Sequence, residues 1–256
     1  MQRELIQRRL AARLSSSGVR SHPVPPEADL SPLQWNQFFD HRRDIRAEPS
    51  AVFRVYSHGL TLDAQESPLL VLLHGGGYSA LSWAPFVRQI VGFCSCRVLA
   101  IDLRGHGSSR TDDDLDLSMR TLVQDVVAVL DQMFVSDRST SSGPDDQPAT
   151  MQATMEDIGF CPQQDDAGRK NVCPPLILIG HSMGGALAVH VAHELANSAA
   201  GYDVRAVVVI DVVEGTALAA LDCMQRVLLN RPNSFSSIRS AIRWWSVQIG
   251  LIDLRN

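Results

Sequence analysis

The chain has few cysteines, no long apolar run and no basic excess, and each absence excludes a class of protein. Five cysteines in 256 residues are too few and too irregularly spaced for a disulfide scaffold, and none has zinc-site spacing. No apolar run approaches the ~18–20 residues of a membrane span. The net charge of −5 argues against nucleic acid as the main partner. Scattered thiols in odd number suit a reducing compartment, so we expect a cytoplasmic location, with a nuclear one left open.

Residues 1–29 are expected to form a disordered basic tail. The first twenty residues carry five arginines against one acid, and no apolar stretch typical of a secretory signal follows. Such a start also suits a mitochondrial transit peptide, but the linker-like segment 22–26 favours the tail. Residues 30–39 then combine a Ser-Pro helix start with three aromatic residues at one-face spacing, which predicts a short helix docked on the domain.

Apolar runs and helical patterns alternate along the middle of the chain. The runs are mostly continuous, as expected of strands buried on both faces of a parallel sheet: 52–56, 69–73, 97–101, 176–179 and 204–210. Helical patterns cover 83–91, 118–133, 183–195 and, further on, about 234–249. This alternation predicts an α/β fold in residues 30–256, with helices on both faces of a mostly parallel sheet. The polar, Gly- and Pro-rich segment 136–174 is predicted to be a disordered insertion.

The strongest motif is G-x-S-x-G, formed by Gly180, Ser182 and Gly184 between an apolar run and a small-residue helix. In such an elbow the serine occupies a strained turn, and nothing bulky fits two residues before or after it. The N–H of Met183 and the helix dipole would favour a developing oxyanion. We therefore predict that Ser182 is a hydrolase nucleophile; the alternative is a tight turn with a helix-capping serine. His181 is expected to point away and to serve packing.

A glycine run after an earlier strand predicts the second oxyanion donor. Residues 74–77 read His-Gly-Gly-Gly, and glycines let backbone N–H groups approach a reacting carbonyl. The expected donor is Gly76 or Gly77. The same run fits a dinucleotide-binding G-x-G-x-x-A pattern with Asp102 at the ribose position, but that interpretation leaves Ser182 unexplained.

A third turn, residues 102–108, borders the same edge of the expected sheet. Asp102 and Arg104 are predicted to tie it by a salt bridge, and its glycines allow a sharp path. His106 is interpreted as a turn or surface residue, with a catalytic role as the weaker alternative.

Asp211 is the candidate triad acid, because it is the first residue past the run 204–210 and lies one strand beyond the elbow. Glu214 and Asp222 are weaker candidates. A triad of this fold has the order serine, acid, histidine, yet no histidine follows Asp211. The eight histidines are His22, His41, His58, His74, His106, His181, His190 and His193. The chain therefore offers no triad histidine at the expected position.

These motifs resemble those of the protein phosphatase methylesterases, which are α/β-hydrolases. The family removes the methyl ester from the C-terminal leucine of type 2A protein phosphatase catalytic subunits. The resemblance covers roughly residues 30–256 apart from 136–174, and its most specific stretch is 210–217. The other matching stretches are 31–35 with Phe39, 53–56, 73–77, 79–83, 102–104, 180–186, 231–235 and 241–246.

The resemblance implies a serine carboxylesterase with Ser182 as nucleophile and Asp211 as triad acid, needing no cofactor or metal. The implied partner is the methylated tail of the phosphatase catalytic subunit, without nucleic acid or membrane. The family's histidine lies near its C-terminus, so this chain resembles the N-terminal portion of such an enzyme, with the C-terminal strands missing and lid-like helices at 217–250. Two alternatives remain open: a catalytically silent phosphatase-binding protein and a general esterase or lipase.

Overall fold

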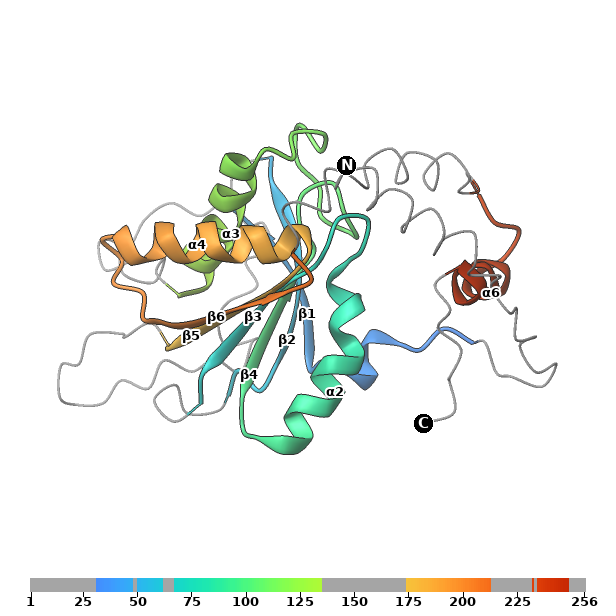
Figure 1. The fold of residues 1–256 in the computed structure, drawn as a ribbon, viewed down its shortest axis with the longest axis horizontal. Helices are drawn as coiled ribbons and strands as arrows, with labels where there is room; N and C mark the ends of the chain where they lie inside the picture. The colour runs from blue at the N-terminus through green and yellow to red at the C-terminus, as the bar shows by residue number, and fades with distance from the viewer. Residues whose placement is uncertain are drawn as a thin grey trace, which may run out of the picture. The chain divides into compact units, whose positions relative to one another are not determined.

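The computed structural model describes residues 31–47, 50–61, 67–134, 174–212, 232 and 234–248 (Figure 1). The chain divides into two compact units, which are considered separately: one is Trp35–Val212, and the other combines Met1–Gln34 with Val213–Asn256. The expected tail at 1–29 lies outside the described residues. So do the expected insertion, except Pro174, and the first part of the expected lid segment.

The larger unit is built on one six-stranded sheet with the order β1-β2-β4-β3-β5-β6. Strands β4, β3, β5 and β6 run parallel, whereas β2 pairs antiparallel with both β1 and β4. The strand bounds are β1 His41–Arg46, β2 Val52–His58, β3 Leu69–Leu73, β4 Arg97–Ile101, β5 Leu176–His181 and β6 Val204–Ile210. The carboxyl ends of the four parallel strands therefore meet at one edge of the sheet.

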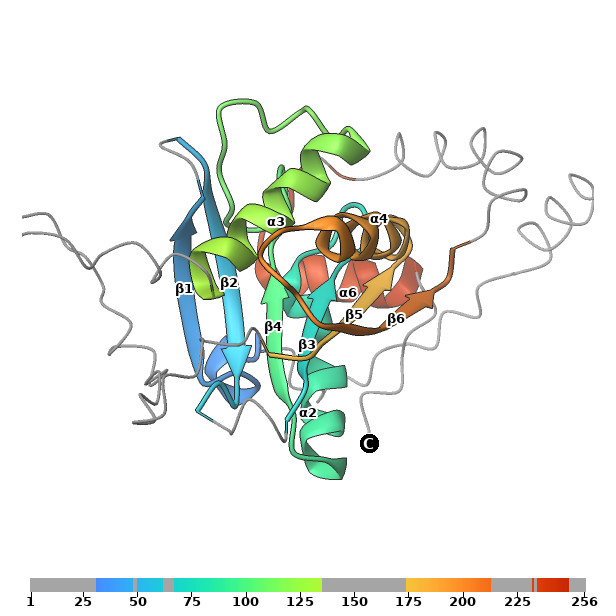
Figure 2. The ribbon, with the colours of Figure 1, turned by 90° about the vertical axis from the view of Figure 1, so that its left-hand side faces the viewer.

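Helices cover both faces of this sheet (Figures 1 and 2). Helices α3 (Met119–Phe134) and α4 (Met183–Asn197) pack on one face, where Leu130 and Leu187 join a core cluster with Val71 of β3. Helix α2 (Ala84–Phe93), preceded by the short 3-10 helix η2 (Ala80–Trp83), packs on the other face. The alternation of apolar runs and helical patterns thus predicted the layered fold correctly.

The predicted strands and helices are confirmed, with shifted ends. Three of the five strand ranges match within the described sheet, and β2 and β5 each extend two residues further. The pattern at 83–91 begins as 3-10 turns, and the helix expected at 30–39 is reduced to the 3-10 helix η1 (Trp35–Gln37). Its neighbour Phe39 is buried against Tyr56, with ring centroids 5.5 Å apart, so the expected docking of this segment is confirmed.

Strand β1 was not predicted, because its sequence is almost entirely polar. Its side chains alternate between half-buried and exposed, as expected of an edge strand. It is held by backbone pairing with β2 and by an ion pair between Asp44 and Arg54. The pattern of apolar residues therefore could not indicate it.

Strand β6 corrects the expectation of burial on both faces. Strands β3 and β4 are buried throughout, but Val207, Val208, Val209 and Ile210 of β6 are 37–44% exposed. The reason is position: β6 is the last strand of the sheet, and among the described residues no strand pairs with its outer side.

The described part of the second unit is centred on helix α6 (Ile238–Gln248), which begins four residues later than expected. Ser237 and Ser240 cap its start reciprocally, because each side-chain oxygen accepts the other residue's backbone N–H at 3.1 Å. Phe235 packs on Trp244 with centroids 5.7 Å apart. Among the described helices of both units, none combines the length and apolar character that a membrane crossing requires.

Candidate active site

Ser182 occupies a strained turn between β5 and α4. Its backbone has φ 51° and ψ −118°, in a region that residues with a Cβ atom rarely adopt. The flanking glycines are required by close packing. A Cβ on Gly180 would lie 2.0 Å from the Gly184 carbonyl oxygen, and one on Gly184 would lie 2.2 Å from the Leu73 carbonyl oxygen. The strand–turn–helix context predicted from G-x-S-x-G is therefore confirmed.

The first turn of α4 leaves a backbone donor beside Ser182. The Ser182 carbonyl accepts the N–H groups of Gly185 and Ala186 at 2.9 and 3.2 Å. Within the described part of the chain, the N–H of Met183 has no backbone acceptor, as is normal for the first residue of a helix. This N–H lies where the helix dipole favours negative charge.

The loop after β3 lies directly against this turn. A Cβ on Gly75 would lie 3.3 Å from the Ser182 Cβ and 2.8 Å from His181 Nδ1, so only glycine allows this approach. A Cβ on Gly76 would lie 3.8 Å from the Met183 sulfur. The loop and the start of α4 thus border one small region around Ser182.

The backbone N–H groups of this loop have different partners. The Gly77 N–H donates to His106 Nε2 at 2.9 Å, and the Tyr78 N–H donates to the Gly75 carbonyl at 3.2 Å. Among the described residues, no acceptor is recorded for the Gly76 N–H. Of the two donors expected from the sequence, Gly76 is therefore the one with a free N–H.

Asp102 holds the neighbouring loop, but not through the expected salt bridge. Its buried carboxylate accepts the backbone N–H groups of Ala80 at 2.7 Å and Ser108 at 2.9 Å. Burial raises the pKa of Asp102, while these two N–H groups act in the opposite direction. Gly107 has φ 58°, and a Cβ there would overlap the Asp102 carboxylate.

Arg104, the expected partner of Asp102, instead reaches helix α3. Two of its nitrogens donate to Asp125 at 2.7 Å each, and a third donates to Thr111 Oγ1 at 2.9 Å. The prediction was wrong because the Asp102 carboxylate turns back toward backbone donors, which leaves the guanidinium free to span to α3.

Asp211 lies at the end of the strand next to the elbow. Strands β5 and β6 pair in register up to His181 and Ile210, and the Ser182 N–H donates to the Ile210 carbonyl at 2.9 Å. Asp211 follows immediately with φ 54°, so the two residues nominated from the sequence end adjacent strands. Its carboxylate lies 4.0 Å from His181 Nε2, and its side chain is 74% exposed.

Comparison with known proteins agrees with this architecture. The model of the alpha/beta hydrolase family matches residues 70–253, which include the glycine loop after β3, the turn at Ser182 and Asp211. The chain belongs to the alpha/beta hydrolase family. Curated relatives named protein phosphatase methylesterase 1 are similar to this chain. Those of Bos taurus and Homo sapiens are each 39% identical over 243 residues, which is 93% of this chain.

A more distant relative of the same name, from Cryptococcus neoformans, is 35% identical over 84% of this chain. These matches cover 52%, 51% and 49% of the three relatives. The chain thus spans about half the length of the curated relatives it matches.

The histidines near the site lie at different distances from Ser182. The ring of His181 packs against Tyr78, with centroids 5.8 Å apart, as expected of a packing residue. It also faces Asp211. His190 and His193 are exposed on α4, about 12 and 16 Å along the helix from Ser182 at 1.5 Å per residue. Within the described residues, no histidine is hydrogen-bonded to the Ser182 hydroxyl. Tyr78 was not nominated from the sequence as a site residue, because its contact with His181 joins two loops that are far apart along the chain.

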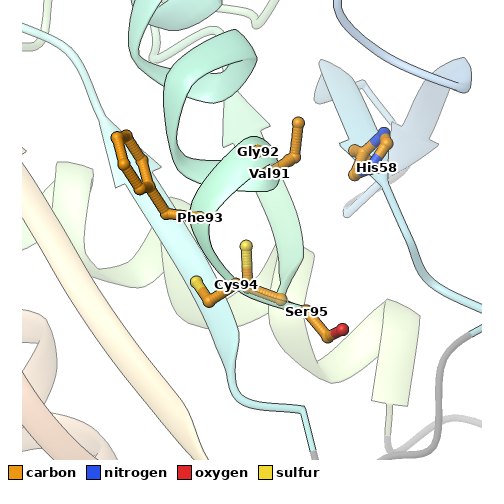
Figure 3. A pocket seen from close by; sticks show the side chains of 7 residues that line it. His58, Val91, Gly92, Phe93, Cys94 and Ser95 are labelled. Carbon is orange, nitrogen blue, oxygen red and sulfur yellow. The ribbon is translucent and has the colours of Figure 1, made fainter.

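A hollow of about 410 Å³ lies at the opposite edge of the sheet from Ser182. Figure 3 shows it beside the end of α2, bordered by His58, Phe93 and Cys94. The described residues contain no group of three or more histidine, cysteine or acidic side chains that could hold a metal ion. The hollow is separate from the Ser182 turn, because none of its lining residues belongs to that turn or to the loops around it.

Proposed function

We propose that this hydrolase is a carboxylesterase that removes the methyl ester from the C-terminal leucine of a type 2A protein phosphatase catalytic subunit. The observation that carries the proposal is the strained turn at Ser182, φ 51°, beside the N–H groups of Met183 and Gly76, neither of which has a backbone acceptor among the described residues. The substrate rests on similarity to relatives named protein phosphatase methylesterase 1. The expected location is the cytoplasm or nucleus, where such a phosphatase tail would be met.

In the proposed reaction, the Ser182 oxygen attacks the carbonyl carbon of the methyl ester. The tetrahedral oxyanion accepts hydrogen bonds from Met183 N–H and from Gly76 N–H, which we favour over Gly77 because that N–H is bound to His106. The serine proton would have to pass through an imidazole base, which the described residues do not place against the Ser182 hydroxyl, to the departing methoxide, which is released as methanol. Water then cleaves the acyl-enzyme and restores the free leucine carboxylate. Asp211 would orient such a base.

A second candidate function is binding of the phosphatase without catalysis. It is favoured by the absence, among the described residues, of a histidine hydrogen-bonded to Ser182. A serine without such a base keeps an alcohol-like pKa and is a poor nucleophile at neutral pH. Removal of a triad member typically lowers turnover by about 10⁴–10⁶-fold.

The decisive experiment compares the 256-residue chain with its Ser182→Ala variant on methylated phosphatase catalytic subunit. Loss of the methyl group is followed by mass spectrometry of the C-terminal peptide. Turnover by the wild type alone supports the esterase. Equal loss with both proteins overturns it, and capture of the unmethylated phosphatase then supports the binding function. A panel of short-chain esters tests the remaining alternative, since broad turnover there with none on the tail indicates a general esterase or lipase.

A further inference from the structure

Two loops at the carboxyl edge of the sheet hold each other through a pair of histidines. His74, in the loop after β3, accepts the Leu103 N–H on its Nε2 at 3.0 Å. His106, in the loop after β4, accepts the Gly77 N–H on its Nε2 at 2.9 Å. The two rings meet edge to face with centroids 5.1 Å apart. The contact is reciprocal, because each loop supplies one ring and one backbone donor.

The hydrogen bonds also define the tautomer of both rings. His74 Nδ1 lies 2.8 Å from the Gly75 carbonyl oxygen, and His106 Nδ1 lies 2.7 Å from the Arg104 carbonyl oxygen. A carbonyl oxygen only accepts, so each Nδ1 must carry the hydrogen. Each Nε2 receives a backbone N–H and must therefore be bare. Both imidazoles are neutral in this arrangement.

The two rings differ in their access to solvent. His74 is fully buried, and burial lowers its pKa to about 4. His106 is only half-buried. The groups that face His106 are the neutral ring of His74 and the buried carboxylate of Asp102, while the Arg104 guanidinium is engaged by Asp125.

Among the described residues, the bond from Gly77 N–H to His106 Nε2 is one of three ties that join the loop after β3 to the loop after β4. Without this acceptor, the loop after β3 would lose the tie at Gly77 and keep those from Ala80 N–H to Asp102 and from Leu103 N–H to His74. Gly76 lies one residue before Gly77, between this anchor and the Met183 side chain. A shift at Gly77 would therefore move the N–H of Gly76, which has no backbone acceptor in the described part of the chain.

We propose that His106 is a positioning residue: its ring accepts the Gly77 N–H and thereby aims the Gly76 N–H at the region in front of Ser182. We call the two reciprocal bonds, from Gly77 N–H to His106 and from Leu103 N–H to His74, the clasp between the loops. The clasp is observed independently of any activity. Its effect on turnover rests on the function proposed above.

Amide hydrogen exchange of Gly77, measured by NMR on the whole chain, tests the clasp directly. His106→Ala removes the acceptor, and we expect Gly77 protection to fall about five- to tenfold at neutral pH, the range expected for one net hydrogen bond. His106→Gln places an amide oxygen near the position of Nε2 and cannot be protonated, so it should restore most of that protection. His190→Ala, which removes an exposed histidine on α4, is the matched control and should change nothing at Gly77.

Rescue by the conservative variant separates the hydrogen bond from a merely structural role of the ring. Equal Gly77 protection in wild type and His106→Ala, or protection in His106→Gln no higher than in His106→Ala, would overturn the proposal.

Turnover of the methylated phosphatase tail adds the functional arm. We expect His106→Ala to lower kcat by about tenfold or more with little change in KM, and His106→Gln to recover part of the loss, because loop aim affects the transition state more than binding. An unchanged kcat in His106→Ala would overturn the positioning role. A wild type without any turnover would instead count against the esterase function, while the exchange measurements would still decide the clasp.

Discussion

At the scale of single residues, strain coincides with the positions nominated for chemistry. Among the described residues, Ser182 and Asp211 are the two non-glycine residues with positive φ. Such conformations cost about 1–3 kcal/mol each and are typical of functional sites. The strain at Ser182 could be predicted because the glycines of G-x-S-x-G mark a turn too tight for other residues on either side of the serine. The strain at Asp211 could not, because no local pattern marks the turn after β6.

Relief of the strain at Ser182 gives a stability prediction. Ser182→Gly removes both the hydroxyl and the Cβ, whereas Ser182→Ala removes only the hydroxyl and keeps the strained backbone. After the extra chain entropy of glycine is subtracted, we expect Ser182→Gly to have a free energy of unfolding about 1 kcal/mol above that of Ser182→Ala. Urea denaturation followed by tryptophan fluorescence measures it. A glycine variant no more stable than the alanine variant would show that the turn is unstrained.

Burial of His74 gives a pH prediction. The pKa of His74 falls from its ordinary 6.5 to about 4 in the folded protein because the ring is buried. The unfolded chain therefore binds the proton more tightly, and stability present above pH 6.5 is lost as the pH falls toward 4. The loss from this group is about 3 kcal/mol.

His74→Gln removes this titration while leaving a side-chain oxygen to accept the Leu103 N–H. The variant should be less stable than wild type at pH 7, and the difference should shrink as the pH falls to 4, as measured by urea denaturation at several pH values. His193→Gln, at an exposed position on α4, is the control. A difference between wild type and His74→Gln that stays constant from pH 7 to pH 4 would refute the assignment.

At the scale of elements, strands are predicted from runs of apolar residues. A polar strand, and the exposure of an apolar strand at the end of the sheet, therefore cannot be predicted in this way. The runs that became β3 and β4 were predicted with correct ends because both strands are buried on both faces. Polar β1 gave no signal, since it is stabilised by pairing with β2 rather than by burial. In β6 the apolar run predicted the strand correctly but not its exposure, because burial depends on which neighbours follow in space.

The exposure of β6 predicts self-association of this chain. An apolar edge strand with unpaired backbone groups is a template for pairing with another copy. Val209 packs toward Gly185 of α4, so Val208 lies on the opposite face of the strand. Val208→Lys should reduce association, because a charge on an edge strand opposes pairing. Val208→Thr, which keeps the branched shape without the charge, should reduce it less.

Light scattering and size-exclusion chromatography over a range of concentrations measure the association. The prediction fails if the wild-type chain remains a monomer with a sharp, reversible melting transition.

At the scale of the whole larger unit, the site is assembled from the ends of four parallel strands. The sequence predicted this meeting, since parallel strands present their carboxyl ends at one edge and each motif followed a run that became a strand. It did not predict how the loops are tied together. The bond from Gly77 to His106 joins residues 29 positions apart, and Arg104 reaches Asp125 across 21 positions. Such distant pairings depend on side-chain directions that local patterns do not contain.

The ion pair between Arg104 and Asp125 connects the site loops to helix α3 and is mostly shielded from solvent, with both side chains about a tenth exposed. Removing one partner of a buried pair leaves an uncompensated charge, so Asp125→Ala should lower the free energy of unfolding by about 3 kcal/mol.

The pair between Asp44 and Arg54 is the matched control, because Asp44 is 41% exposed. Asp44→Ala should therefore cost less than about 1 kcal/mol, and its effect should shrink in high salt. Denaturant unfolding of both variants at two salt concentrations checks this. Equal costs would mean that the loop after β4 is not anchored to α3, and the coupling between the helix layer and the Ser182 edge would then have to run through the apolar core alone.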